Sequence, residues 1–164
     1  MEKLTDHIPD VWFDFYARLL PGTYVALIVF YSPLRIHAPE KRGVLLLLFA
    51  AYIVGYMLQP IGSFLSRSIE KLSITETERT RYYQIEQNAD NLSRGMLLVQ
   101  KAWSESVCFS SFSVGSVFSA LYIKYKKPES EICWLTLATI AFIVFSIDRI
   151  AVKKGRMEAI KKGT

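Results

Sequence analysis

The chain has 164 residues, of which 51% are hydrophobic, and its formal net charge is +5. This length allows one domain, and two cysteines and two histidines are too few for a disulfide framework or a zinc site. The apolar residues lie in blocks and the charges lie between them, whereas a helix of a soluble protein carries one apolar and one charged stripe. The distribution therefore predicts an all-α fold, an integral membrane four-helix bundle.

The first predicted element is a short helix over residues 6–20. Its apolar side chains recur at helical spacing: Ile8, Val11, Trp12, Phe15, Tyr16 and Leu19. A short aromatic helix joined directly to a hydrophobic stretch is typical of a helix that lies in the headgroup layer, with Trp12 and Arg18 at the membrane interface. The alternative is a helix packed against the protein's own cytoplasmic part.

Two hydrophobic spans follow, over residues 19–34 and 43–64. Pro21 and Gly22 are expected to turn the chain between the lying helix and the first span. That span is shorter than the ~20 residues of a full crossing. A re-entrant hairpin with the second span is therefore the competing layout.

The second span departs from plain apolar sequence at two places. Ala51 and Gly55 form a pair of small residues, spaced by four, that lets another helix come close. Gln59 and Pro60 near its end are its only polar or broken point, because the missing proline amide leaves a carbonyl without its usual donor.

A polar stretch covers residues 65–103. Ser73 to Glu76 has the pattern of a capping box, which predicts a helix start. Apolar residues then recur at spacings of three and four and form a heptad seam: Tyr82, Ile85, Ala89, Leu92, Met96, Val99 and Trp103. An apolar seam is unstable in water, and a second copy of the chain is its simplest cover. These seven positions are the predicted oligomer or partner interface.

The same heptad phase continues into the third span, residues 104–125, where the face becomes mostly small and hydroxylated: Ser106, Ser110, Ser113, Val117 and Ala120. We infer one long helix from about Glu76 to Tyr125. In lipid, helices associate through close packing of small residues and through interhelical hydrogen bonds. Two interpretations of this serine row stay open, helix packing and the lining of a hydrated pore, and they concern Ser106, Ser110, Ser113, Gly115 and Ser119.

The fourth span covers residues 132–150 and leads into a basic tail, residues 151–164. Four spans place both termini and the polar stretch on one side, which carries 14 Lys and Arg residues against 6 in the two hairpin loops. The more basic side is expected to be cytoplasmic. Trp134 then lies at the outer membrane boundary, and Lys153 and Lys154 lie at the inner one beside anionic lipid.

The sequence carries no recognised catalytic pattern. It has no Gly-rich phosphate loop, no H-E-x-x-H and no nucleophile elbow. The centres of the four spans also lack the ionisable group that a proton-coupled transporter places near the midplane. We therefore expect no enzymatic activity, no cofactor and no direct contact with nucleic acid, and we expect the basic charge to face the lipid bilayer.

Two stretches resemble a group of small bacterial inner-membrane proteins, some encoded in phage-defence loci: Phe15-Tyr16-Ala17-Arg18-Leu19-Leu20-Pro21-Gly22, and Tyr52-Ile53-Val54-Gly55-Tyr56 with Leu58 and Ser63. The four-span layout is similar to that of the membrane subunit of the Kiwa defence system. The resemblance covers the layout of most of the chain and few specific residues. It implies a sensor or anchor in a bacterial inner membrane that forms homo-oligomers and works with a cytosolic effector.

These observations together predict a non-enzymatic, oligomeric membrane sensor or scaffold, with antiviral defence as the context that the resemblance implies. It is expected to recruit a cytosolic protein through residues 76–103 and the basic tail. The alternative is a pore-forming or membrane-depolarising effector lined by the serine row.

Overall fold

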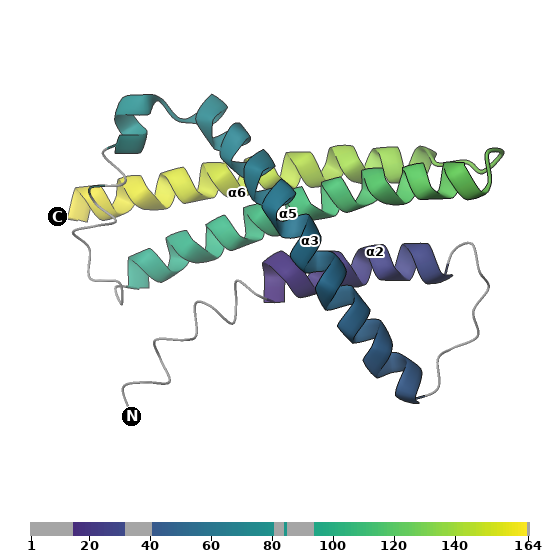
Figure 1. Cartoon of the computed structure of the whole chain (residues 1–164). Helices are drawn as coiled ribbons and strands as arrows, with labels where there is room; N and C mark the ends of the chain where they lie inside the picture. The colour runs from purple at the N-terminus through teal and green to yellow at the C-terminus, as the bar shows by residue number, and fades with distance from the viewer. Residues whose placement is uncertain (1–14, 32–40, 81–83, 85–93, 164) are drawn as a thin grey trace.

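The structure is a computed structural model that describes residues 15–31, 41–80, 84 and 94–163 (Figure 1). All regular secondary structure in these ranges is helical, so the predicted all-α class is confirmed. The elements are a π-helix η2 (Phe15–Leu19) and the α-helices α2 (Leu20–Tyr31), α3 (Lys41–Ser73), α5 (Arg94–Lys126) and α6 (Cys133–Gly163). Residues 76–80 form a further helical turn.

The long helices form a bundle around α5. α5 and α6 run antiparallel and side by side, α3 crosses both diagonally, and α2 lies alongside α5 (Figure 1). α2 and α5 run in the same direction, because Leu20 shares a cavity with Cys108 while Ile28 packs against Ile123. The Ser73 end of α3, the Arg94 end of α5 and the Gly163 end of α6 therefore lie at one end of the bundle.

Three helices in the described part of the chain are long and apolar enough to cross a membrane. These helices cover Leu47–Ser73, Met96–Lys126 and Cys133–Ile160, and each contains an apolar stretch of 18 residues. The first predicted span is different, because α2 has only 12 residues. At 1.5 Å per residue it covers about 18 Å, less than the ~30 Å of a hydrocarbon core. Of the four predicted crossings, three thus have a helix of sufficient length within the described ranges.

The predicted turn at Pro21 and Gly22 is absent, since helical structure runs unbroken from residue 15 to residue 31. Pro21 has no amide hydrogen for the carbonyl of Ala17. The wider π-helical turn of η2 lies directly before this point, and such turns absorb local irregularities of a helix. Most of the predicted headgroup-layer helix, including Trp12, lies outside the described residues.

The outside of the bundle is apolar, and its interior combines apolar side chains with serines. Met57, Phe64 and Leu137 are 70%, 72% and 68% exposed. In contrast, all nine buried polar side chains of the described residues are serines: Ser66 on α3, Ser146 on α6, and Ser104, Ser106, Ser110, Ser111, Ser113, Ser116 and Ser119 on α5. Water would penalise so much uncovered apolar surface, whereas lipid tails solvate it and small residues let helices pack closely. The burial pattern and the three long apolar helices mark a membrane protein with α5 at its centre.

The buried face of α5 does not keep the predicted heptad phase. The first three serines of that phase are buried, but Val117, the next position, is exposed, and Ser116 and Ser119 are buried instead. An α-helix has 3.6 residues per turn, so a heptad stripe drifts by ~20° per repeat along a straight helix. The interior of the bundle therefore follows the helical period.

Candidate functional site

α2 and α3 cross where their backbones touch. A Cβ atom on Gly22 would lie 1.7 Å from the carbonyl oxygen of Ala51, and one on Gly55 would lie 1.8 Å from the carbonyl oxygen of Arg18. Only glycine leaves room for backbones this close. The predicted close approach at Ala51 and Gly55 is confirmed, and the crossing joins the two stretches that carry the family resemblance.

Arg18 lies in this crossing, among polar and aromatic side chains of α3. Its Nε donates to Oε1 of Gln59 at 2.8 Å, and its guanidinium carbon lies 5.2 Å from the centre of the Tyr56 ring. A guanidinium nitrogen also lies 3.5 Å from the Tyr52 hydroxyl. A cation beside apolar helices needs such partners, because an unpaired charge there is costly. Arg18, predicted as a membrane-interface residue, thus joins η2 to Gln59 of α3.

Four buried serine hydroxyls from three helices close a ring of hydrogen bonds. Ser66 of α3 and Ser146 of α6 each lie 2.8 Å from the hydroxyl of Ser110 on α5. Ser106, one turn earlier on α5, lies 3.0 Å from Ser146 and donates to Ser66 at 3.1 Å. Because each hydroxyl has one donor and two acceptor positions, the four groups satisfy one another without water. We call this set the serine ring.

The rest of the serine row is also enclosed by the chain's own helices. The Ser116 hydroxyl lies 2.8 Å from the hydroxyl of Tyr24. A Cβ atom on Gly115 would lie 2.5 Å from Val25, so Gly115 packs directly against α2. All five residues assigned to packing or a pore are therefore inside a single copy of the chain: Ser106, Ser110, Ser113, Gly115 and Ser119.

Sequence reasoning missed the partners of these residues on other helices. Ser66 and Ser146 complete the ring, and the phenylalanines of α5 and α6 stack nearby, with Phe112 and Phe142 4.9 Å apart between ring centres. The spacing of Phe109 to Phe112 and of Phe142 to Phe145 is three residues on both helices. That shared spacing is the signal that predicts matching aromatic faces.

The polar ends of α3, α5 and α6 form a small core that we call the headpiece: residues 67–80, 94–105 and 149–160. Met96 and Val99, two of the seam residues, are buried there against Ile74 and Met157, with Ile160 packed on the outside. The chain itself covers them, where we expected a second copy. The reason is that α6 stays helical to Gly163, which brings Met157 over the seam. The seam residues Tyr82, Ile85, Ala89 and Leu92 lie outside the described residues.

Ion pairs join the helices of the headpiece. Lys153 Nζ donates to Oε1 of Glu70 at 2.7 Å, and the two side chains are only 18% and 14% exposed. The same ammonium lies 4.5 Å from the centre of the Trp103 ring. Lys154 pairs with Glu78 at 3.3 Å. The last seam residue and the two lysines predicted at the inner membrane boundary therefore hold α3, α5 and α6 together.

A capping box starts the helical turn after α3. The Thr75 hydroxyl and amide donate to one oxygen of Glu78 at 2.9 and 3.1 Å. The hydroxyl hydrogen bond is the main cause of the lowered pKa of Glu78. The predicted box began two residues earlier, at Ser73, but Ser73 is the last residue of α3. The interruption between α3 and the next helical turn falls later than predicted, because the side chain of Ile74 packs in the headpiece core.

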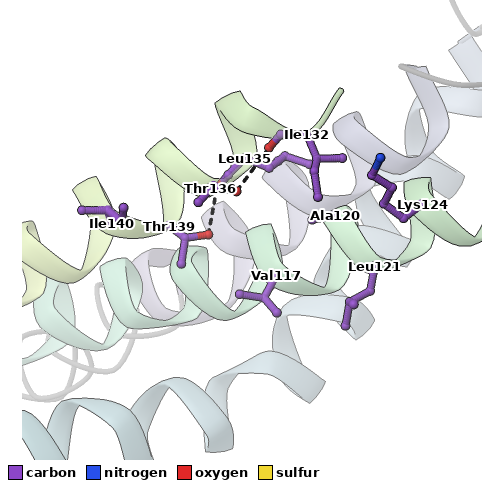
Figure 2. Close-up of a pocket in the computed structure, with 9 residues that line it drawn as sticks. All are labelled: Val117, Ala120, Leu121, Lys124, Ile132, Leu135, Thr136, Thr139 and Ile140. Atoms are coloured by element: carbon purple, nitrogen blue, oxygen red, sulfur yellow. Dashed lines mark hydrogen bonds between the residues drawn. The ribbon is translucent and has the colours of Figure 1, made fainter. Parts of the chain in front are cut away.

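The bundle carries two grooves beside its helices. One, of about 370 Å³, lies between Leu20, Phe112 and Phe145 and ends at the ion pair of Arg149 with Glu105, whose atoms are 3.3 Å apart. The other follows α5 and α6 near their connecting loop, close to the exposed Trp134 (Figure 2). Within the described ranges, no three His, Cys, Asp or Glu side chains converge as a metal site would require.

No known protein family, curated protein or solved structure matches this chain. The all-α fold and the three long apolar helices fit a membrane protein. The family resemblance noted from the sequence stays a prediction.

Proposed function

We propose that this chain is a non-enzymatic membrane scaffold that docks a cytosolic protein on its headpiece. The observation that carries the proposal is the headpiece core of Ile74, Met96, Val99 and Met157, which binds three helix ends together beyond their most apolar segments. Ion pairs across the same helices add to it. A surface held in this way is preorganised, so a partner that binds it loses less conformational entropy.

The headpiece is proposed to lie on the cytoplasmic side of a bacterial inner membrane. Arg67 and Lys71 are exposed, one helical turn apart, at the end of α3. The C-terminal part of α6 adds further basic residues at the same end. Basic residues at the ends of membrane helices favour the cytoplasmic side and its anionic lipids. This orientation places the C-terminus in the cytoplasm.

The docking surface is proposed to be formed by exposed leucines of the headpiece, Leu97 and Leu98 at the start of α5 and Leu72 at the end of α3. All three side chains are exposed, although the helix segments of the headpiece are rich in charged residues. Arg67 and Lys71 belong to the same headpiece and are exposed as well. We infer a partner that presents an apolar helix face with acidic residues beside it, because such a face matches both the leucines and the cations.

The competing function is a pore lined by the serine row. The packing within one chain supports the scaffold over this pore, because the hydroxyl groups of the serine ring hydrogen-bond to one another across α3, α5 and α6. A water-filled pore would need those hydroxyls to face a shared lumen. Self-association and a role in antiviral defence stay part of the proposal, the latter through the resemblance alone.

The test is quantitative affinity capture of the full-length tagged chain from bacterial membranes. The test variant changes Leu97 and Leu98 to Asp together. The control changes Thr77 and Thr80 to Asp, because both are also exposed on the headpiece but are not among its exposed leucines. The proposal expects one cytosolic protein at near-equal molar amount with the wild type and the control, and at least about tenfold less with the leucine variant.

Two results would overturn the proposal. One is capture that the leucine variant leaves unchanged. The other is loss of membrane potential when the wild-type chain is expressed alone, abolished by Ser110→Leu, which would support the pore instead.

A further inference from the structure

A narrow groove runs along α5 and α6 at the loop end of their hairpin (Figure 2). Its volume is about 250 Å³, and its wall includes Val117 and Leu121 of α5, Ile132 just before α6, and Ile140 of α6. This is below the ~300–1,000 Å³ of pockets for drug-sized ligands. Its size and its course along two helices fit a slender chain better than a ring-shaped molecule.

The wall of the groove is apolar even where it is formed by threonines. The Thr139 hydroxyl donates to the carbonyl oxygen of Leu135 at 2.8 Å, and the Thr136 hydroxyl turns back to Ile132 in the same way at 3.5 Å (Figure 2). The hydroxyl hydrogen of each threonine is thus used in a hydrogen bond to the carbonyl oxygen four residues earlier. The groove offers an occupant hydrocarbon contact along most of its length.

One end of the groove lies at the loop that connects α5 and α6. Lys124 is the only charged residue of the wall, and its Nζ donates to the carbonyl oxygen of Pro128 at 2.8 Å. Tyr125 near the end of α5 and Trp134 near the start of α6 are exposed, as aromatic residues are at the boundary of a membrane. Val117 lies seven residues before Lys124, so the groove reaches about 10 Å into the hydrocarbon region.

The surroundings of Lys124 are basic on balance. Lys126 and Lys127 are exposed at the end of α5, and the ammonium of Lys126 lies 5.9 Å from the centre of the Tyr125 ring. The exposed carboxylates of Glu129 and Glu131 lie in the connecting loop. Neither carboxylate lines the groove. A negatively charged group at the rim of the groove therefore contacts Lys124 before it reaches Glu129 or Glu131.

We propose that this groove is a binding site for an anionic phospholipid: one acyl chain lies between α5 and α6, and Lys124 binds the phosphate. An ammonium on a flexible stem suits a phosphate as a point charge, and the exchange of the carbonyl of Pro128 for a phosphate strengthens its hydrogen bond. The site needs no contact with the headpiece, so it is independent of the scaffold function.

The test is native mass spectrometry of the delipidated, full-length protein titrated with phosphatidylglycerol or with phosphatidylcholine of the same acyl chains. Lys124→Gln removes the phosphate contact, and Lys126→Gln is its control because Lys126 does not line the groove. Thr136→Trp fills the groove, and Leu137→Trp is its control because Leu137 is the exposed neighbour outside the wall. Melting temperatures of all variants in detergent verify folding.

The proposal expects the wild type to bind its first phosphatidylglycerol more tightly than phosphatidylcholine. Lys124→Gln should weaken only phosphatidylglycerol, by about fivefold, the effect of one basic residue beside an anionic headgroup. Thr136→Trp should weaken both lipids by about tenfold, because several methylene groups lose their contacts. Equal affinity of the wild type for the two lipids, controls that weaken binding as much as the test variants, or competition by glycerol phosphate as strong as by whole lipid would overturn it.

Discussion

The hydroxyl groups of Ser66 on α3 and Ser110 on α5 lie 2.8 Å apart, and neither side chain is exposed. In water such a bond would replace bonds to solvent and contribute little. Between helices in lipid there is no apolar driving force for association, so close packing and hydrogen bonds decide which faces meet. The serine ring connects α3, α5 and α6 at the place where their most apolar segments give way to the headpiece.

Ser110→Ala should destabilise the bundle, because it removes two hydrogen bonds of the serine ring. Interhelical hydrogen bonds in membrane proteins contribute ~0.6 kcal/mol on average and at most ~1.7. We expect the free energy of unfolding to fall by about 1–2 kcal/mol in a denaturant titration in mixed micelles. Ser119→Ala is the matched control, since this buried hydroxyl has no hydrogen-bond partner among the described residues. Equal losses for both variants would contradict the role of the ring.

Much of the fold can be predicted from the sequence because the strongest signals are local. Whole helical turns without charge predict the long helices α3, α5 and α6, and a pair of small residues four apart predicts the close approach at Gly55. The partners of these features could not be predicted, because they depend on contacts between distant segments. Nothing near Ser110 in the sequence points to Ser66 or Ser146.

The structure differs from the prediction in two places for physical reasons that can be found in the sequence. The headpiece core includes Met157 and Ile160, which continue the helical spacing from Ile150 into the stretch predicted as a basic tail. Their spacing predicts that the helix continues, but the lysines around them led to the prediction of a basic tail. The heptad phase predicted Val117 inside the bundle, and the 3.6-residue period of a straight helix places it outside.

Gly55→Ala should disrupt the crossing of α2 and α3. Its methyl group would lie 1.8 Å from the carbonyl oxygen of Arg18, so the helices must separate. Overpacking of this kind typically costs ~1–3 kcal/mol, which thermal unfolding in detergent would detect as a lower melting temperature. Gly155→Ala is the control, because the position is open and alanine favours a helix by ~1 kcal/mol. A melting temperature that is unchanged in the first variant would show that the two backbones are not in contact.

Arg18→Lys should be costly although it keeps the charge. Lysine has no Nε donor in the place that reaches Gln59 and no planar group to stack on Tyr56. Hydrogen bonds to charged groups contribute ~1.5–3 kcal/mol, and we expect a loss in this range in the same micelle titration. Arg67→Lys on the exposed side of α3 serves as the control, with an effect within ~0.5 kcal/mol. A larger loss of unfolding free energy for Arg67→Lys than for Arg18→Lys would refute the assigned contacts of Arg18.

A double-mutant cycle of Glu70→Gln and Lys153→Gln should give a coupling energy of about 1 kcal/mol or more. The pair is short, at 2.7 Å, and mostly shielded from solvent. The pair of Arg79 and Glu76 is 3.8 Å apart and exposed, and its cycle should stay below ~0.5 kcal/mol. A Glu70–Lys153 coupling no larger than that of the exposed pair would mean that the headpiece is not held by this contact.

The most direct test of the bundle is spin labelling in liposomes with collision partners of opposite solubility. Single labels at Met57, Phe118 and Leu137, with Cys108 and Cys133 replaced by Ala, should collide often with oxygen, which dissolves in lipid, and rarely with a water-soluble nickel chelate. Labels at Leu72 and Lys101 in the headpiece should show the opposite preference. If the nickel chelate reached Met57, Phe118 and Leu137 as easily as the headpiece positions, the apolar side chains would face water, and an interior of serines within a lipid-solvated bundle would be ruled out.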